Sequence, residues 1–145
     1  MTVSVIVYGR NDNHGYNYHK RVSLSLNSIS ESLDDDDEIV FVDWNSPEGH
    51  PPLPVSIADT LTPRTHQLLQ VVAVPPSIHA AVVASRVRRH IVEPHARNVG
   101  IRQAQDNSDW ILSTNTDVIF VPRRDNWQAL LKNTGNSYFP CPRFE

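Results

Sequence analysis

The stretch Val3–Tyr18, VSVIVYGRNDNHGYNY, decides the fold class of this chain. Its first part, Val3–Tyr8, is short and rich in β-branched residues, which predicts a buried strand. Its polar second part, Gly9–Tyr18, predicts a loop. An amphipathic helix is predicted next, over about His19–Leu33, because apolar residues recur at spacings of four, three and four and share one face. These residues are Val22, Leu26, Ile29 and Leu33.

Strands and helices continue to alternate along the rest of the chain. Further strands are predicted over 39–42, 71–74 and 110–113, and 118–121 is expected to continue as extended chain. Helices are predicted over about 57–70, over 78–91 with Ser77 as cap, over about 94–105 with Pro94 in the first turn, and over 127–132 with Asp125 as cap. We expect a solvated turn at 34–38, irregular chain at 50–54 and at most an edge strand within 137–145. This alternation predicts one α/β domain over 1–145, with three layers, a Rossmann-like arrangement and a mainly parallel central sheet.

Composition narrows the class of protein. The chain has 145 residues, of which 39% are hydrophobic and 20% charged, as expected for one globular domain. Its net charge of −3 argues against a nucleic-acid-binding surface. The single cysteine, Cys141, allows no intrachain disulfide and favours a reducing compartment. The first ten residues lack the pattern of a secretory signal, and no stretch approaches the ~20 apolar residues of a membrane span. We therefore expect a cytoplasmic protein, with peripheral attachment to a membrane surface left open.

Three polar clusters follow predicted strands: GRND at 9–12, DWNSPEG at 43–49 and NTD at 115–117. In an open α/β sheet, ligands bind beyond the carboxyl ends of the strands. Because all three clusters fall at such ends, their shared position predicts a binding site there.

Four residues at or near these strand ends have side chains suited to a metal ion, a nucleoside or a phosphate. Asp117 offers the hard oxygen that Mg²⁺ or Mn²⁺ prefers, and Asn115 could add a carbonyl oxygen; the alternative is an Asx turn. Asp43 could accept hydrogen bonds from a ribose hydroxyl or a base N–H, or equally serve as a cap or turn residue. Arg97, near a helix N-terminus, is suited to phosphate, although a surface ion pair is its ordinary role.

Other sites are not supported. The seven histidines form no zinc pattern, and Arg86, Arg88 and Arg89 are interpreted as a solvated helix face. Walker, G-x-G-x-x-G and G-x-S-x-G motifs are absent from the sequence.

Three stretches of the sequence carry four motifs whose order resembles that of a known family, and the third stretch holds two of them, Ala96–Ile101 and Asn115–Asp117. VSVIVYGRNDNHG, EIVFVDWNSPEG and EPHARNVGIRQAQDNSDWILSTNTDVIF resemble the successive signatures of the inverting glycosyltransferase family 2. The resemblance covers roughly Val3–Pro122. It implies a GT-A fold, a nucleoside-diphosphate sugar as donor (a UDP-sugar first), and Mn²⁺ or Mg²⁺ as cofactor. The acceptor, whether saccharide, lipid or protein, stays unknown.

The resemblance also assigns roles to residues. It places Gly9, Arg10, Asn11 and Asp12 in the loop that touches the nucleotide. It places Asp43, with Asn45 beside it, at the base or ribose, and Arg97 near the base and phosphates. Asp117 corresponds to the last acid of the D-x-D motif, which meets the metal, and Asn115 corresponds to its first acid.

The sequence departs from the family pattern in three places. Asn115 replaces the first acid of D-x-D, and Trp44-Asn45 replaces the usual acid and small residue after Asp43. Family members continue into a second half with the acceptor site and the general base. The acids after Asp117 are Asp125 and Glu145, and neither lies in a family motif. The catalytic base is therefore unknown, and we expect a chain without the acceptor-binding half.

Three functions remain at this point. The leading interpretation is the donor-binding part of a glycosyltransferase. A non-catalytic nucleotide- or nucleotide-sugar-binding module, or a truncated remnant, is the alternative, and the Asn115 substitution favours it. A sugar-phosphate nucleotidyltransferase ranks last, because its Gly-rich basic opening loop is missing.

Overall fold

The centre of the molecule is a sheet of four strands, all paired in parallel, in the order β3-β2-β1-β4. The computed structural model describes residues 1–83, 90–121 and 131–132. The strands are β1 (Val3–Gly9), β2 (Glu38–Trp44), β3 (Leu69–Val74) and β4 (Trp110–Ser113). The helices are α1 (Tyr18–Ser30), α2 (Leu53–Ser56), the 3₁₀ helix η1 (Ala58–Thr60), α3 (Pro63–Leu68), α4 (Pro76–Val82) and α5 (Glu93–Gln103). The predicted α/β class with a parallel sheet is confirmed.

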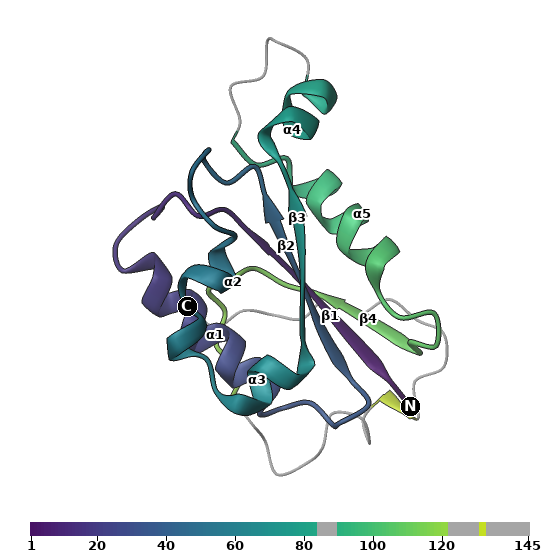
Figure 1. The fold of residues 1–145 in the computed structure, drawn as a ribbon. Helices are drawn as coiled ribbons and strands as arrows, with labels where there is room; N and C mark the ends of the chain where they lie inside the picture. Colours follow the sequence, from purple (N-terminus) through teal and green to yellow (C-terminus); the bar gives the residue numbers. More distant parts are fainter. Residues whose placement is uncertain (84–89, 122–130, 133–145) are drawn as a thin grey trace.

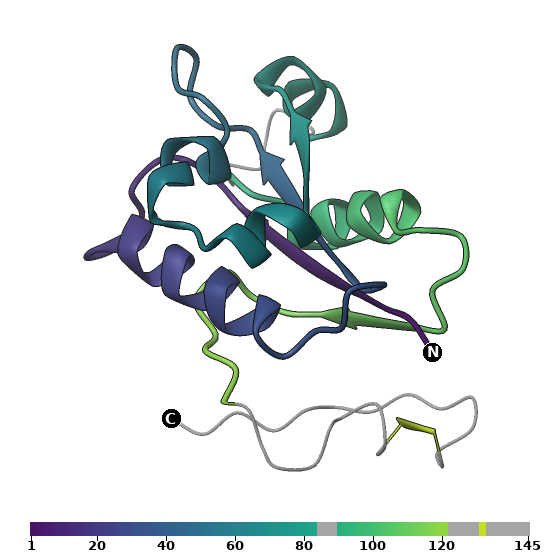
Figure 2. The same ribbon diagram turned by 60° about the horizontal axis from the view of Figure 1, so that its bottom comes forward.

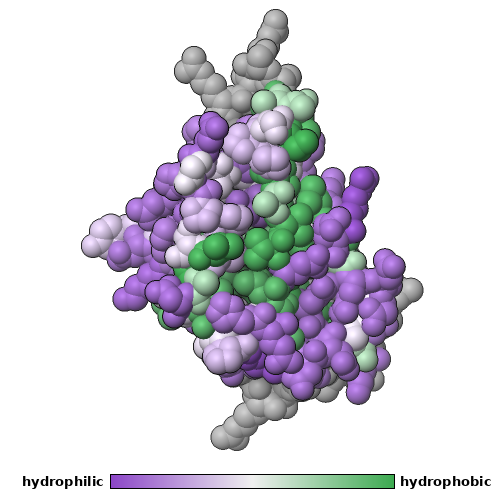
Figure 3. All heavy atoms as spheres, in the orientation of Figure 1, coloured by the Kyte–Doolittle hydropathy of each residue, from purple (hydrophilic) through white to green (hydrophobic). Residues whose placement is uncertain are grey.

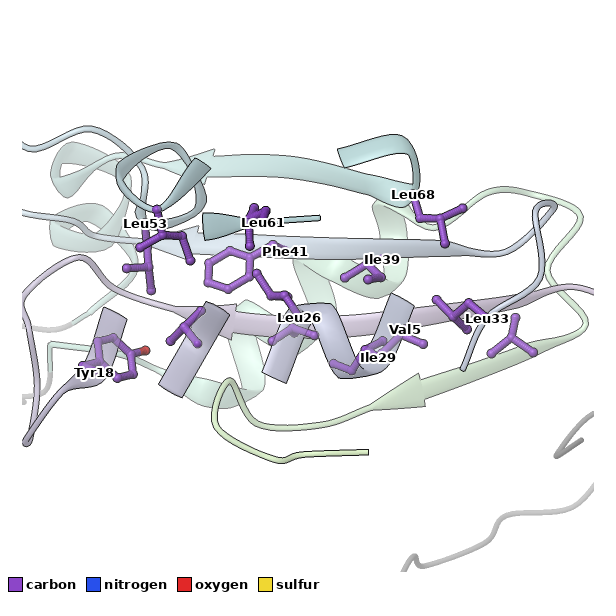
Figure 4. Close-up of a cluster of buried hydrophobic side chains, with 14 residues drawn as sticks. Val5, Tyr18, Leu26, Ile29, Leu33, Ile39, Phe41, Leu53, Leu61 and Leu68 are labelled. Carbon is purple, nitrogen blue, oxygen red and sulfur yellow. The ribbon is translucent and has the colours of Figure 1, made fainter. Parts of the chain in front are cut away.

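Helices cover both faces of the sheet (Figures 1 and 2). On one face, α1, α2 and α3 pack over the larger of two apolar clusters, part of which Figure 4 shows. Its buried members include Val5, Leu26, Ile29, Phe41 and Leu68. On the other face, Ala96 of α5 packs in a smaller cluster with Tyr8, Val42, Trp44 and Val74 of the sheet. The alternation of side chains along β1 and β2 supplies both clusters, because successive residues of a strand point to opposite faces.

Helix α5 approaches the sheet closely at Gly100. A Cβ atom at this position would lie 2.2 Å from Cγ2 of Ile6 and 3.2 Å from Cγ2 of Val42. Real carbon atoms do not approach so closely, so the absence of a side chain is what lets the helix lie against β1 and β2.

Strand β3 forms one edge of the sheet and is largely exposed. Val74 is its buried residue, and the exposed fraction of Val71 is 37%. Figure 3 shows apolar side chains gathered over β3 and toward its border with α5.

Several predictions about local structure were wrong. Within the acidic run, Asp37 is buried rather than solvated, because its carboxylate accepts the backbone N–H groups of Val3 and Asp34, each at 2.8 Å. The stretch expected to be irregular contains the start of α2. The single helix predicted over about 57–70 is instead the short η1 followed by α3, which begins at Pro63, where the Thr62 side chain accepts the N–H of Thr65. Strand β3 already begins at Leu69.

The third predicted helix also differs. Helix α4 begins at Pro76, its cap position is Pro75 rather than Ser77, and it ends at Val82. Three other predictions fall wholly or mostly outside the described residues. They concern the arginines at 86, 88 and 89, the helix over 127–132 with its Asp125 cap, and the C-terminal stretch 137–145. Among the helices that are described, none has the length and apolar character needed to cross a membrane.

Candidate functional site

The connection pattern creates a switch point between β1 and β4. From β1 the chain moves outward to β2 and β3, then returns past both to place β4 on the other side of β1 (Figure 1). Ligands of open parallel sheets bind at the carboxyl ends of the strands at such a point. In this protein the ends of β1 and β4 carry the first and third polar clusters.

Gly9, the last residue of β1, is where these two clusters meet. A Cβ atom on Gly9 would lie 2.8 Å from the Tyr18 hydroxyl, 2.9 Å from Cγ2 of Thr116 and 3.0 Å from Phe41. The Tyr18 hydroxyl also pairs with the Thr116 hydroxyl at 3.1 Å. Burial, the largest cause, raises the pKa of Tyr18, so this hydroxyl is protonated at neutral pH. The turn at 115–117 is thereby held against the end of β1.

The loop after β1 is tied to the loop after β2. Arg10 donates from Nε to the Asn45 carbonyl oxygen at 2.5 Å and from Nη1 to the Asp12 carboxylate at 2.7 Å. Asn45 has a left-handed backbone, with φ of 58°, which asparagine tolerates better than most residues. Its side chain donates to the His90 carbonyl at 2.9 Å. Arg10, Asp12 and Asn45 therefore fix the shape of this edge.

Asn11 is committed to internal contacts. Its side chain is buried and donates to the Pro51 carbonyl and the Ser56 hydroxyl, while Oδ1 faces Nε2 of His19 at 2.8 Å. Its backbone N–H donates to the Ser46 hydroxyl at 2.8 Å. Asn11 thus joins the loop after β1 to α1 and α2.

Asp43 is buried at the end of β2. Its Oδ1 accepts the backbone N–H of Leu53 at 2.7 Å and the Ser46 hydroxyl at 2.8 Å. Burial raises the pKa of the Asp43 carboxyl above its ordinary value, and these two hydrogen bonds together with the positive charge of Arg10 lower it in part. The contact to Leu53 places Asp43 at the start of α2, in the turn-and-cap role that the sequence left open.

The most connected group at the switch point surrounds Arg97, in the second turn of α5. Its guanidinium donates to the Ser113 hydroxyl at 2.5 Å, to the Tyr8 hydroxyl at 3.1 Å and to Oδ1 of Asn115 at 3.3 Å. The Tyr8 hydroxyl lies 3.1 Å from the same Asn115 oxygen. About a third of the Arg97 side chain, 31%, stays exposed, with Glu93 3.8 Å away on the same helix. Arg97 is therefore a fixed cation at the edge of the sheet that still reaches solvent.

Asp117 lies on the other side of the same turn. Its Oδ2 accepts Nη1 of Arg21, on α1, at 2.7 Å, and both side chains are 39% exposed. Among the described residues, no group of three histidine, cysteine, aspartate or glutamate side chains could hold a metal ion. Asp117 therefore offers one hard oxygen donor of the kind that divalent cations prefer, and the described residues do not complete a metal site around it.

All nine predicted site residues lie at the carboxyl edge of the sheet, in two contacting groups and a third position. The first group is Arg10, Asn11, Asp12, Asp43 and Asn45, and the second is Arg97 with Asn115. The third position is Asp117 alone, which pairs with Arg21, and Gly9 lies against Thr116 beside it. The sequence prediction missed Tyr8, Ser113 and Arg21. Tyr8 and Ser113 belong to predicted strands and Arg21 to a predicted helix, and their partners are distant in the sequence, so no local pattern marks them.

No family model matches the chain, and no curated protein matches it at a significant level.

Proposed function

We propose that this chain binds a nucleoside-diphosphate sugar at the carboxyl ends of β1 and β4, as the donor-binding part of a family 2 glycosyltransferase with a GT-A fold. The observation that carries the proposal is the group formed by Arg97, Tyr8 and Asn115. The hydrogen bonds of this half-buried guanidinium go to neutral partners, and its acidic neighbour, Glu93, is mostly exposed at 3.8 Å. Guanidinium is the side-chain group best suited to a diphosphate.

Two further features support this choice over other anions. The open parallel sheet has its switch point at this group, as dinucleotide- and nucleotide-binding sheets do. The order of the four motifs along the chain resembles the family signatures. In this proposal the loop after β1 faces the nucleoside, the buried Asp43 supports that loop through Ser46, and Arg97 faces the phosphates.

A divalent cation has a defined place in the proposal. Asp117 and the diphosphate oxygens would together hold Mn²⁺ or Mg²⁺, whose charge stabilises the departing diphosphate. The chain's own contribution is orientation: the Tyr8 and Ser113 hydroxyls hold the Arg97 guanidinium in place before the ligand arrives. Such preorganisation reduces the entropy lost on binding.

A second candidate is a non-catalytic nucleotide-binding module. One observation favours it: the position of the first D-x-D acid is an asparagine, whose side-chain oxygen is occupied by Arg97 and Tyr8. Such a module would bind the nucleotide without releasing sugar from it.

Calorimetric titration of the purified chain with a panel of nucleoside diphosphates, with and without Mn²⁺, tests the proposal. We expect saturable binding of at least one, UDP first, that is stronger with Mn²⁺. Absence of binding across the panel would contradict both candidates. Incubation with the matching nucleotide-sugars then separates them, because a transferase part hydrolyses the donor slowly or transfers it, whereas a module leaves it intact.

A further inference from the structure

Arg21 makes more contacts than an ordinary exposed ion pair requires. Besides the 2.7 Å bond to Asp117, it donates from Nε to the Tyr16 carbonyl and from Nη2 to the His14 carbonyl, each at 3.1 Å. Its Cζ atom lies 5.4 Å from the centroid of the Tyr18 ring. The guanidinium therefore has a fixed position that does not depend on Asp117 alone.

The backbone around Arg21 is shaped to accept it. Gly15 has φ of 74°, and a Cβ atom there would lie 2.9 Å from Nη2 of Arg21. Asn13 and Asn17 also have left-handed backbones, with φ of 53° and 54°. This loop thus presents two carbonyl oxygens to the guanidinium, whose Nη1 donates to Asp117.

A divalent cation at Asp117 would have to share its place with this guanidinium. The carboxylate carries one negative charge, which Arg21 already balances at 2.7 Å. A metal ion added alone would leave an excess of positive charge at this ion pair, and the described residues form no group of three histidine, cysteine, aspartate or glutamate side chains that could offset it. A diphosphate brings further negative oxygens, and with it both cations can be balanced.

We propose that Arg21 is the residue that makes metal binding at Asp117 depend on the nucleotide. The proposal rests on the proposed function. Without nucleotide, Arg21 occupies the Asp117 carboxylate and keeps the metal affinity low. With the diphosphate present, the metal takes the carboxylate, and Arg21, still held by the carbonyls of His14 and Tyr16, faces the phosphate oxygens.

Mn²⁺ titrations followed by electron paramagnetic resonance, with and without UDP, test this role. The proteins are the wild type, the two neutral variants Arg21→Gln and Arg21→Met, and Lys20→Gln as a matched control. Lys20 is the exposed neighbour on the same helix, so its variant removes the same charge without touching Asp117. Two neutral variants are used so that the result does not depend on the folding of one of them.

Without UDP, we expect the neutral variants to bind Mn²⁺ roughly two- to fivefold more tightly than the wild type, the factor that corresponds to an exposed ion pair. The ratio of Mn²⁺ affinities with and without UDP should fall by at least the same factor, whereas Lys20→Gln should match the wild type. A merely structural Arg21 would give the opposite result, because loosening the loop weakens binding in both conditions. Adding Asp117→Asn to Arg21→Gln should abolish the gain.

Three results would overturn the role of Arg21. One is an unchanged Mn²⁺ affinity of both neutral variants without UDP. Another is a gain that survives Asp117→Asn, which would place the metal elsewhere. The last is UDP binding that needs Arg21 but no metal, which would make the guanidinium a substitute for the cation. If no protein bound UDP at all, the proposed function would fail, while the titrations with Mn²⁺ alone would still decide whether Arg21 blocks Asp117.

Discussion

The guanidinium of Arg97 lies over the aromatic ring of Tyr8, with its Cζ atom 4.9 Å from the ring centroid, and it also donates to the Tyr8 hydroxyl at 3.1 Å. This contact joins α5 to β1 across 89 positions of the sequence. Burial, the largest cause, raises the pKa of Tyr8, so at neutral pH its hydroxyl is protonated and can donate to Asn115 while it accepts from Arg97. The orientation of the cation at the edge of the sheet thus depends on a neutral tyrosine.

Replacing Tyr8 by phenylalanine tests this dependence. Tyr8→Phe keeps the ring under Arg97 and removes the hydroxyl, so the affinity for nucleoside diphosphate should fall by about 0.5–1.5 kcal/mol, the net value of one hydrogen bond. Calorimetry measures the loss. Tyr16→Phe is the control, because the Tyr16 side chain is 88% exposed. Equal affinities of Tyr8→Phe and the wild type would show that the hydroxyl does not orient Arg97.

The raised pKa of Asp43 predicts a pH-dependent effect of Asp43→Asn on stability. Because the folded-state pKa lies above the unfolded value, the contribution of this group to stability is fully present below the unfolded pKa of about 3.9 and is lost as the pH rises through the folded pKa. Asparagine does not titrate, and its Oδ1 can accept both native hydrogen bonds. The free energy of unfolding of Asp43→Asn, relative to the wild type, should therefore increase as the pH rises from about 3 to about 7.

Urea denaturation at a series of pH values measures this difference. Asp59→Asn serves as the control, because it removes the same charge from an exposed position. A relative stability of Asp43→Asn that falls with rising pH would contradict the assignment of burial as the dominant cause.

Asp37→Ala should be much more destabilising than Asp36→Ala, although the two residues are neighbours in the same acidic run. Removing the Asp37 carboxylate leaves the N–H groups of Val3 and Asp34 without their acceptor, and one buried unsatisfied group costs about 1–3 kcal/mol. The Asp36 side chain is exposed, so its loss should stay within about 0.5 kcal/mol. Chemical denaturation of both variants gives the comparison, and equal stabilities would contradict the structural role of Asp37.

Gly100→Ala should destabilise the domain although alanine favours helices. Alanine in place of glycine within a helix gains about 0.5–1 kcal/mol, but the new methyl group would lie 2.2 Å from Cγ2 of Ile6, and overpacking costs about 1–3 kcal/mol. Gln103→Ala, at an exposed position of α5, is the control. In the double variant with Ile6→Ala, the cost of Gly100→Ala should shrink or change sign. A cost that is the same in both backgrounds would place the strain elsewhere.

The sequence predicts the architecture because the signals for strands and helices are local. The β-branched run Val3–Tyr8 and the apolar periodicity of α1 each need no distant partner, and the alternation of such segments is enough to predict a parallel sheet. The helix predicted over about 57–70 has the wrong bounds, because the Thr62 cap makes Pro63 the first residue of α3 and β3 begins at Leu69.

The candidate site is less predictable, because its decisive contacts join distant residues. Asp37 binds the N–H of Val3, which is 34 positions away, and Asp117 binds Arg21, which is 96 positions away. Nothing in either local sequence distinguishes a solvated carboxylate from a bound one. Asp43, Arg97 and Asp117 could be chosen in advance because they follow strands or begin a helix. Tyr8 and Arg21 could not, because each fits an ordinary position in its strand or helix pattern.

The affinity of Arg97→Ala for UDP in the presence of Mn²⁺, measured by calorimetry beside Arg102→Ala, tests the central claim most directly. Both arginines lie on α5, but Arg102 is exposed in its last turn, away from the carboxyl edge of the sheet. Loss of a charge-assisted hydrogen bond predicts that Arg97→Ala weakens binding by about 1.5–3 kcal/mol, or about 10- to 150-fold, while Arg102→Ala binds as the wild type does. Equal affinities of the two variants, or no binding of UDP by the wild type, would contradict a nucleotide site at the ends of β1 and β4.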